Sequence, residues 1–276
     1  MFVTVGNYVL TSSILTSSDG INWTSKNPGT TNFIGGIAYG NNKFVAAREY
    51  SGLWESSDNL SSSMDWDLIF NDSKDYKVEY GGGDFIAFRD NIIRCSKDNY
   101  TESHLSNFTN ANILSAAYGY GKWVVVGGVG KVAYSSDCMN WNEGPIVGTP
   151  QWDLLKVVYG KNHFVAFNES DHKYFSASHN NISDNVTWIE NNTTYKISDV
   201  SFIDNEFIAL YDSSKIAMTN GYDNVTFGSW SQINGLPNDL KYIEGGNSKL
   251  LGIPNGQNFK LFVGSKSNLT GSWIFL

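Results

Sequence analysis

Carboxylates are the most frequent groups in this chain that could do acid–base chemistry, and they are scattered along it. The candidates in or beside expected loops include Glu49, Asp90, Glu169, Asp171 and Asp212. Two carboxylates at a set separation are sufficient for glycoside hydrolysis. Positions in a sequence do not give that separation, and scattered acids are normally solvated surface groups. A glycoside hydrolase therefore stays open as one hypothesis.

Other catalytic and metal-binding patterns are absent from the sequence. The histidines, His104, His163, His172 and His179, lack a metal-ligand spacing such as His-Glu-x-x-His. Cys95 and Cys138 are too few for a disulfide framework or a structural zinc site, and we expect two free, small apolar side chains. No catalytic residue, metal or cofactor is predicted.

Binding of a polar ligand fits the expected loops better. Aromatic rings beside amides, acids and arginines offer apolar faces and directional hydrogen bonds to a sugar or a polar protein surface. The candidate contact residues are Arg48, Tyr50, Arg89, Asp90, Trp152, Glu169, Asp171, His172, Tyr211 and Asp212. The alternative is that these are ordinary solvated loop residues, and that Trp152 belongs to the core.

Composition restricts the partners. The 276 residues carry a net charge of −8 with a pI near 4.9, which opposes binding to a phosphate backbone. No stretch is long and apolar enough to span a bilayer. The first residues enter strand-like sequence without a basic segment or an apolar run, so no secretory signal is expected.

The elements that must position these loops are short strands in a repeating unit, which is clearest over residues 117–141. Each unit has a Gly- or Asn-rich turn followed by a large apolar residue, because such turns need positive φ and the next strand is buried. The seven turns cover residues 5–7, 39–43, 80–84, 118–122, 159–163, 202–206 and 245–249.

A second marker is an aromatic residue that starts the fourth strand of each unit. These residues are Trp23, Trp66, Phe108, Trp141, Trp188, Trp230 and Trp273, with gaps of 43, 42, 33, 47, 42 and 43. Seven units in 276 residues give about 39 residues each, the size of a four-stranded propeller blade. The prediction is an all-β chain, a single domain over 1–276 that forms a seven-bladed β-propeller with four-stranded antiparallel blades. The first and last units are each expected to supply four strands.

A polar turn precedes several of these aromatics, with Asp19 before Trp23, Asp58 before Trp66, Asp98 before Phe108 and Asp137 before Trp141. An Asp carboxylate can accept backbone N–H bonds and close such a turn. These residues resemble the Asp-box (BNR) repeat, Ser/Thr-x-Asp-x-Gly-x-x-Trp, of sialidase-like propellers. Here Gly follows the first Asp directly and is replaced by Cys or Asn in other units. The resemblance implies structural roles for Asp19, Trp23, Asp58, Trp66, Asp98, Asp137 and Trp141.

Sialidase activity itself is not expected. In the family three arginines from separate blades clamp a carboxylate. This chain has only Arg48, Arg89 and Arg94, and the last two fall in one unit.

Three hypotheses follow from the residues and the resemblance. The favoured one is a non-catalytic recognition propeller, similar to those of phage tails or bacterial surfaces, that binds a cell-surface glycan or protein. The alternatives are a glycoside hydrolase acting on a surface polysaccharide and an assembly propeller that docks tail or baseplate proteins. Binding to nucleic acid and insertion into a membrane are not expected. A phage origin would place the chain in a virion or extracellular particle after synthesis in the cytoplasm.

Overall fold

The computed structural model describes residues 2–8, 11–19, 21–26, 33–57, 66–109, 111–148, 152–168, 172–178, 187–193, 196–211, 215–219, 230–233, 240–246, 249–254, 262–265 and 274–275. Strands dominate this part of the chain, and its helical segments are the short 3₁₀ turns η1 (Ser96–Asp98), η2 (Ser106–Phe108) and η3 (Gly128–Gly130). The chain is therefore all-β, as predicted.

The chain divides into two compact units. The first comprises Met1–Ile113, Gly121–Trp123 and Ser135–Trp141, and the second comprises Leu114–Tyr120, Val124–Tyr134 and Asn142–Leu276. The division passes through the sheet β12 (Ile113–Gly119), β13 (Lys122–Gly127), β14 (Val132–Ser135) and β15 (Asn142–Glu143).

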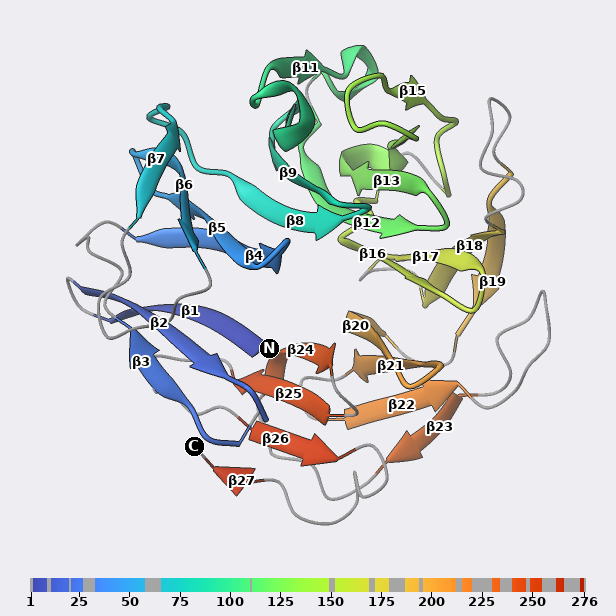
Figure 1. Cartoon of the computed structure of the whole chain (residues 1–276). Coiled ribbons are helices and arrows are strands. Elements are labelled where there is room, and N and C mark those ends of the chain that lie inside the picture. Colours follow the sequence, from blue (N-terminus) through green and yellow to red (C-terminus); the bar gives the residue numbers. More distant parts are fainter. Residues whose placement is uncertain are drawn as a thin grey trace. The chain divides into compact units, whose positions relative to one another are not determined.

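Three antiparallel sheets belong to the first unit, and each is built from consecutive strands (Figure 1). They are β1 (Phe2–Tyr8), β2 (Thr11–Ser17) and β3 (Thr24–Lys26); β4 (Ile34–Gly40), β5 (Lys43–Arg48), β6 (Gly52–Ser57) and β7 (Asp67–Phe70); and β8 (Lys77–Gly81), β9 (Asp84–Arg89), β10 (Ile92–Cys95) and β11 (Glu102–His104).

Three further four-stranded sheets belong to the second unit. They are β16 (Lys156–Gly160), β17 (His163–Phe167), β18 (Lys173–Ser178) and β19 (Ile189–Asn192); β20 (Ile197–Ile203), β21 (Glu206–Tyr211), β22 (Lys215–Thr219) and β23 (Trp230–Ile233); and β24 (Leu240–Gly246), β25 (Lys249–Pro254), β26 (Phe262–Ser265) and β27 (Ile274–Phe275).

Two-residue turns join the first two strands of five of these sheets, and both turn residues have positive φ in each. The pairs are Asn41–Asn42, Gly82–Gly83, Tyr120–Gly121, Lys161–Asn162 and Asp204–Asn205. Positive φ at both positions defines the type I′ turn, whose twist matches that of the strands. The Gly- and Asn-rich sequence marker predicted these five turns correctly.

The first sheet differs from the prediction. Gly6 and Asn7 lie inside β1, where they pair with Ser13 and Ser12, instead of forming a turn. The sheet has three strands in the described part of the chain, so the expectation of a four-stranded first unit is wrong there. The error arose because Gly and Asn also occur inside strands, where the residue type alone does not specify a turn.

Four of the seven aromatics precede or begin the fourth strand of their sheet as expected, whereas Trp23 precedes the third strand of the first sheet. Strands β3, β7, β15 and β19 directly follow Trp23, Trp66, Trp141 and Trp188, and Trp230 begins β23. Trp273 lies outside the described residues. Phe108 does not start a strand, because β11 has already paired with β10 through Ile92 and His104, and Phe108 is buried in η2.

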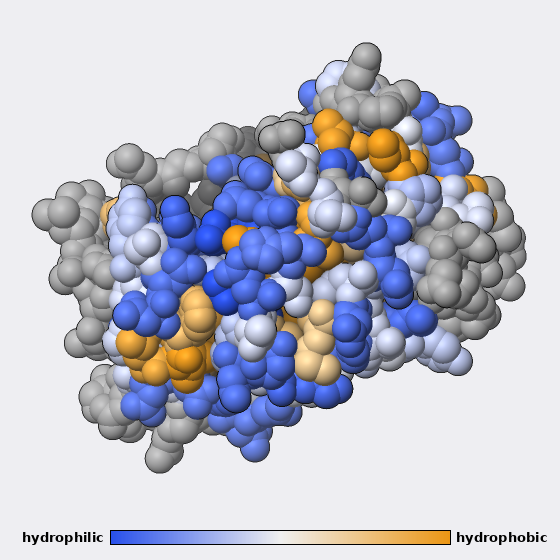
Figure 2. Space-filling model, turned by 90° about the horizontal axis from the view of Figure 1, so that it is seen from above, coloured by the Kyte–Doolittle hydropathy of each residue, from blue (hydrophilic) through white to orange (hydrophobic). Residues whose placement is uncertain are grey.

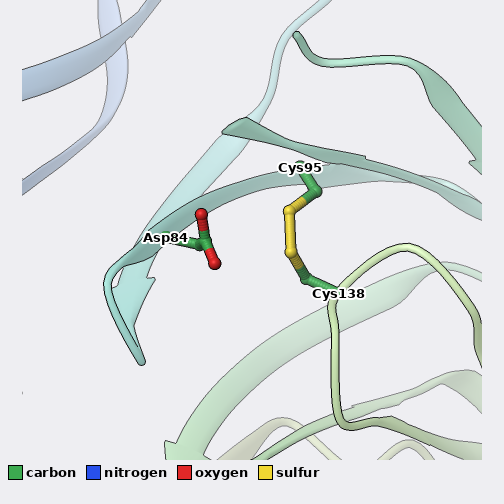
Figure 3. Close-up of side chains that lie close together, drawn as sticks. All are labelled: Asp84, Cys95 and Cys138. Carbon is green, nitrogen blue, oxygen red and sulfur yellow. A yellow bond between two sulfur atoms is a disulfide. The ribbon is translucent and has the colours of Figure 1, made fainter. Parts of the chain in front are cut away.

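The two cysteines form a disulfide, so the expectation of free thiols is wrong (Figure 3). Cys95 ends β10, and Cys138 lies in the segment Ser135–Trp141 of the same unit. Their separation of 43 residues is about one repeat, and a repeating fold brings such positions together. In the chain-entropy account a bridge over this length stabilises a fold by about 4 kcal/mol.

Glycines at the ends of the first strands allow neighbouring sheets to approach closely. A Cβ on Gly40 would lie 2.3 Å from the ring of Tyr80, and one on Gly119 would lie 2.1 Å from the ring of Tyr159. A Cβ on Gly160 would lie 2.3 Å from the ring of Phe202. No side chain can occupy these positions without displacing an aromatic ring of the next sheet.

The same aromatic rings pair across their own hairpins. Tyr80 and Phe85 are directly opposite in β8 and β9 with ring centroids 4.8 Å apart. The centroid distances are also 4.8 Å for Tyr159–Phe164 and Phe202–Phe207, and 4.7 Å for Tyr39–Phe44. Tyr80, Tyr159 and Phe202 therefore each stabilise their own sheet and cover a glycine of the preceding one.

We predict that Gly160→Ala lowers the free energy of unfolding by about 1–3 kcal/mol, because the new methyl group overlaps the ring of Phe202. Urea unfolding measures this change. Gly35→Ala is the matched control, since its Cβ would meet no atom closer than 3.5 Å. A neutral Gly160→Ala variant would contradict the role assigned to this close approach.

Candidate functional site

A cleft of about 200 Å³ lies in the first unit. It is lined by Phe33, Gly35, Ala47, Glu49, Asp75 and Tyr76. These residues come from the start of β4, the end of β5 and the connection that precedes β8. The volume is below the roughly 300–1,000 Å³ of sites for drug-sized ligands, so the cleft suits one sugar ring or one side chain.

The lining of the cleft combines aromatic rings with carboxylates. Phe33 is 40% exposed, Tyr76 is buried, and Glu49 and Asp75 are the charged residues of the lining. Phe33 is held in place through its carbonyl oxygen, which accepts a hydrogen bond of 2.7 Å from the Glu49 amide. Such a lining can stack on an apolar face and accept hydrogen bonds from hydroxyl groups.

A buried polar network fixes Tyr76. Its hydroxyl donates to Asp72 Oδ2 at 2.7 Å and accepts from Arg94 Nε at 2.9 Å. Arg94 Nη1 also donates to the Tyr100 carbonyl oxygen at 3.0 Å, and its Nη2 pairs with Glu102. Burial raises the pKa of Tyr76, so its hydroxyl stays neutral. The cleft therefore has a rigid aromatic wall.

Two predicted contact residues lie at strand ends and are buried. Arg48 is 4% exposed, and its guanidinium lies 4.2 Å from the ring centroid of Trp54 and 5.2 Å from that of Trp66. Burial lowers the pKa of Arg48 to about 10. Tyr211 is 2% exposed and ends β21. The expectation that these residues lie in loops is wrong, since Arg48 is the last residue of β5 and Tyr211 the last of β21. It is wrong in the same way for Arg89, which is the last residue of β9.

Other predicted contact residues do lie in turns. Tyr50 is 71% exposed in the turn after β5, and Asp90 is exposed in the turn after β9, where it pairs with Arg89 at 2.6 Å. His172, in the second unit, is exposed before β18. Glu169, Asp171 and Asp212 are outside the residues that the structure describes.

These turns share a left-handed backbone that the sequence did not reveal. Tyr50, Asp90 and His172 have φ of 55°, 45° and 50°, and Val129 in η3 has φ of 51°. Such values are uncommon for non-glycine residues, and Val is a β-branched example. Strained turn residues concentrate at functional sites, so this conformation supports the turns after second strands as candidate contact segments.

Trp152 belongs to the second unit and is 36% exposed. The adjacent Asp153 accepts a hydrogen bond of 3.0 Å from the Val129 amide through Oδ1, and the Leu154 amide donates to the Gly127 carbonyl oxygen at 3.0 Å. Trp152 therefore lies beside the turn that follows β13, the second strand of its sheet.

Hydrophobic residues on the face in Figure 2 form small separate groups among hydrophilic ones.

The Asp turns have a structural geometry. Asp137 Oδ1 accepts hydrogen bonds from the amides of Met139 at 3.0 Å and Asn140 at 2.8 Å, and Asp19 Oδ1 accepts from Ile21 and Asn22 at 2.8 and 2.7 Å. The Asn22 and Ile21 amides hold the pKa of Asp19 below its usual value.

The other turns of this type are less uniform. Asp98 lies in η1, where its carbonyl oxygen accepts a hydrogen bond from Thr101 Oγ1 at 2.9 Å. The Trp141 indole donates to the Cys138 carbonyl oxygen at 2.9 Å. Asp58 lies outside the described residues. The turn chemistry thus varies, while the aromatic residue that follows is placed similarly at Trp23, Trp66 and Trp141.

The sequence did not single out Phe33, Asp75 or Tyr76. They lie in connections between sheets, where the repeat carries no marker. Their signal was limited to an aromatic residue two positions before Gly-Gly, at 33–36, and to the Asp-Tyr pair before β8. Within the described residues, no helix is long and apolar enough to cross a membrane.

The chain matches no protein-family model, and no curated protein matches it in sequence. Solved structures do resemble it. YCF48 from Cyanidioschyzon merolae is 11% identical with a TM-score of 0.62, covering 88% of this chain and 84% of its own.

Two further solved structures are similar. The β-propeller domain of Cps50 (Swd1) from Myceliophteria thermophila is 7% identical with a TM-score of 0.61, covering 92% of this chain and 93% of its own. BamB from Moraxella catarrhalis is 10% identical with a TM-score of 0.57, covering 98% and 86%. At these identities the likeness concerns the fold alone, and it supports a β-propeller fold for this chain.

We predict that Asp137→Asn destabilises the protein at neutral pH by about 1–2 kcal/mol, the cost of losing a charged cap of backbone amides. Burial alone raises the pKa of Asp137, but the hydrogen bonds from Asn140 and Met139 outweigh it and lower the pKa to about 2. The ionised form therefore stabilises the fold above the unfolded-state pKa near 3.8.

This contribution is lost as the pH falls from about 4 towards 2. Urea unfolding of the parent and Asp137→Asn proteins between pH 7 and pH 2 measures it, and the difference between them should shrink across that window. A difference that stays constant with pH would show that the charge of Asp137 is not what stabilises the turn.

Proposed function

We propose that this chain is a non-catalytic recognition propeller that binds a bacterial cell-surface glycan, as the receptor-binding part of a phage tail or a phage-tail-like particle. In this proposal the repeats close into seven Asp-box-type blades. The observation that carries it is the cleft of about 200 Å³, which two aromatic residues, Phe33 and Tyr76, and two acidic residues, Glu49 and Asp75, line together. Rings with hydrogen-bond acceptors beside them suit the apolar face and hydroxyl edge of a sugar.

The surface chemistry supports an extracellular particle. A net charge of −8 disfavours binding to nucleic acid, and the Cys95–Cys138 bridge fits an oxidising environment. The exposed turn residues Tyr50 and Asp90 extend the contact surface of the first unit beyond the cleft. Turns vary without disturbing the strands, which suits a protein that must follow changes in its receptor.

The proposal predicts that Phe33→Ala and Tyr50→Ala each weaken binding to a surface glycan by about tenfold or more, as expected for exposed aromatic anchors. A glycan array identifies the ligand, and calorimetry on that ligand gives the Kd. Tyr242→Ala is the matched control, because Tyr242 is an exposed tyrosine of the second unit.

Equal losses in all three variants would point to a non-specific effect of exposed aromatics. Absence of binding to intact cells and to the array would remove the proposal. Co-purification with a tail or baseplate protein, without affinity for cells, would favour the assembly role instead.

A second candidate function rests on Glu49 and Asp75, because both acidic residues line the same cleft. Two carboxylates facing a sugar are the requirement of a glycoside hydrolase. This alternative predicts release of reducing sugar from a surface polysaccharide, and loss of that activity by a factor of at least about 100 in Glu49→Gln or Asp75→Asn. Binding without release, with folding intact in both variants, would exclude it for the polysaccharide tested.

A further inference from the structure

Three potential metal ligands lie together at one end of the sheet β8–β11. Cys95 Sγ, Cys138 Sγ and a carboxylate oxygen of Asp84 are all within 4.8 Å of one another (Figure 3). Asp84 begins β9 and Cys95 ends β10, while Cys138 comes from the turn closed by Asp137. Both cysteines are 1% exposed, and Asp84 is half-buried.

We propose that this cluster binds Zn²⁺ when the disulfide is reduced, with Cys95, Cys138 and Asp84 as ligands and water in the fourth position. Thiolates and carboxylates bind zinc at about 2.3 and 2.0–2.2 Å in a tetrahedral arrangement. Ligand atoms around such an ion lie about 3.3–3.8 Å apart, as follows from those bond lengths. The three side chains place their ligand atoms within 4.8 Å of one another, and opening the S–S bond lets the two sulfur atoms separate to this spacing. The inference is independent of glycan binding.

Reduction of the Cys95–Cys138 disulfide requires a reductant, for which we name a dithiol. Two electrons and two protons from the dithiol cleave the S–S bond and leave two thiols, while the dithiol closes to its own disulfide. Zinc then displaces both thiol protons to solvent. With Asp84 ionised, the site carries −1 in the bridged form and −1 in the zinc form, because two thiolates and one carboxylate offset the 2+ ion. Metal binding therefore adds no net charge to a largely buried site.

The segments that carry the ligands are held by contacts other than the bridge. Ser96 Oγ donates to Asp84 Oδ1 at 3.3 Å and accepts from the Phe85 amide at 2.9 Å. The Tyr100 amide donates to the Cys95 carbonyl oxygen at 2.8 Å. Outer hydrogen bonds of this kind orient metal ligands. We therefore expect the three side chains to stay close after reduction.

Cys138 occupies a backbone position that glycine adopts more easily. Cys138 has φ of 58°, a left-handed conformation that favours glycine. In the first Asp turn the residue after Asp19 is Gly20. A cysteine in this position costs backbone strain, which the disulfide offsets in the oxidised protein and the metal would offset in the reduced one.

The test uses the full chain, reduced with a phosphine under anaerobic conditions and freed of metal. Titration with Co²⁺ should produce the thiolate-to-cobalt charge-transfer absorption at one ion per chain, and Zn²⁺ should displace the cobalt. Cys138→Ser should abolish this absorption. Asp84→Asn should weaken cobalt binding by about tenfold or more. Asp67→Asn is the control, because Asp67 is an exposed acid of the same unit outside the cluster.

Asp84→Asn keeps the disulfide, so its folding can be verified before reduction even where Cys138→Ser fails to fold. Unchanged cobalt binding and spectrum in Asp84→Asn would overturn the three-residue site. Absence of charge-transfer absorption in the reduced parent protein, while circular dichroism shows it folded, would overturn metal binding altogether. Neither result bears on glycan binding by the oxidised protein, which is measured separately.

Discussion

The close approach of neighbouring sheets at first-strand glycines is the constraint on which this fold depends. Where Gly40, Gly119 and Gly160 lack a Cβ, the rings of Tyr80, Tyr159 and Phe202 occupy the space. Each ring also pairs with an aromatic residue across its own type I′ turn, Tyr80 with Phe85, Tyr159 with Phe164 and Phe202 with Phe207. A short run of aromatic, glycine, turn and aromatic thus sets the hairpin, its register and the spacing to the preceding sheet together.

Polar side chains reinforce the same spacing in the second unit. Ser115 Oγ accepts a hydrogen bond of 3.2 Å from the Val157 amide, and Ser201 Oγ accepts one of 2.8 Å from the Gly245 amide. Buried Asp199 accepts from the Ile243 amide at 2.8 Å and pairs with Lys156 at 2.8 Å. First strands of successive sheets are therefore joined by hydrogen bonds between side chains and backbone amides.

Because the repeat encodes these contacts, much of the fold could be predicted from the sequence. Five turns and the tryptophans before β3, β7, β15 and β19 follow directly from residue type and spacing. The errors occur where one residue type serves two roles. Gly6 and Asn7 resemble a turn but continue a strand, and Phe108 resembles a strand start but fills a 3₁₀ turn. Pairing of Cys95 with Cys138 depends on spatial proximity, which a count of two cysteines does not reveal.

The candidate site was harder to predict because several of its residues lie in the connections between sheets, which the sequence repeat does not mark. Tyr50 and Asp90 could be placed in turns, since strands flank them, but Phe33, Asp75 and Tyr76 belong to connections of irregular length. The turns between third and fourth strands also differ from one sheet to the next. Hydrogen bonds to Asp137 close one turn, η1 forms another, and a disulfide joins the two. Since the glycine–aromatic contacts already hold the sheets, these turns can acquire a ligand site or a metal site without loss of the fold.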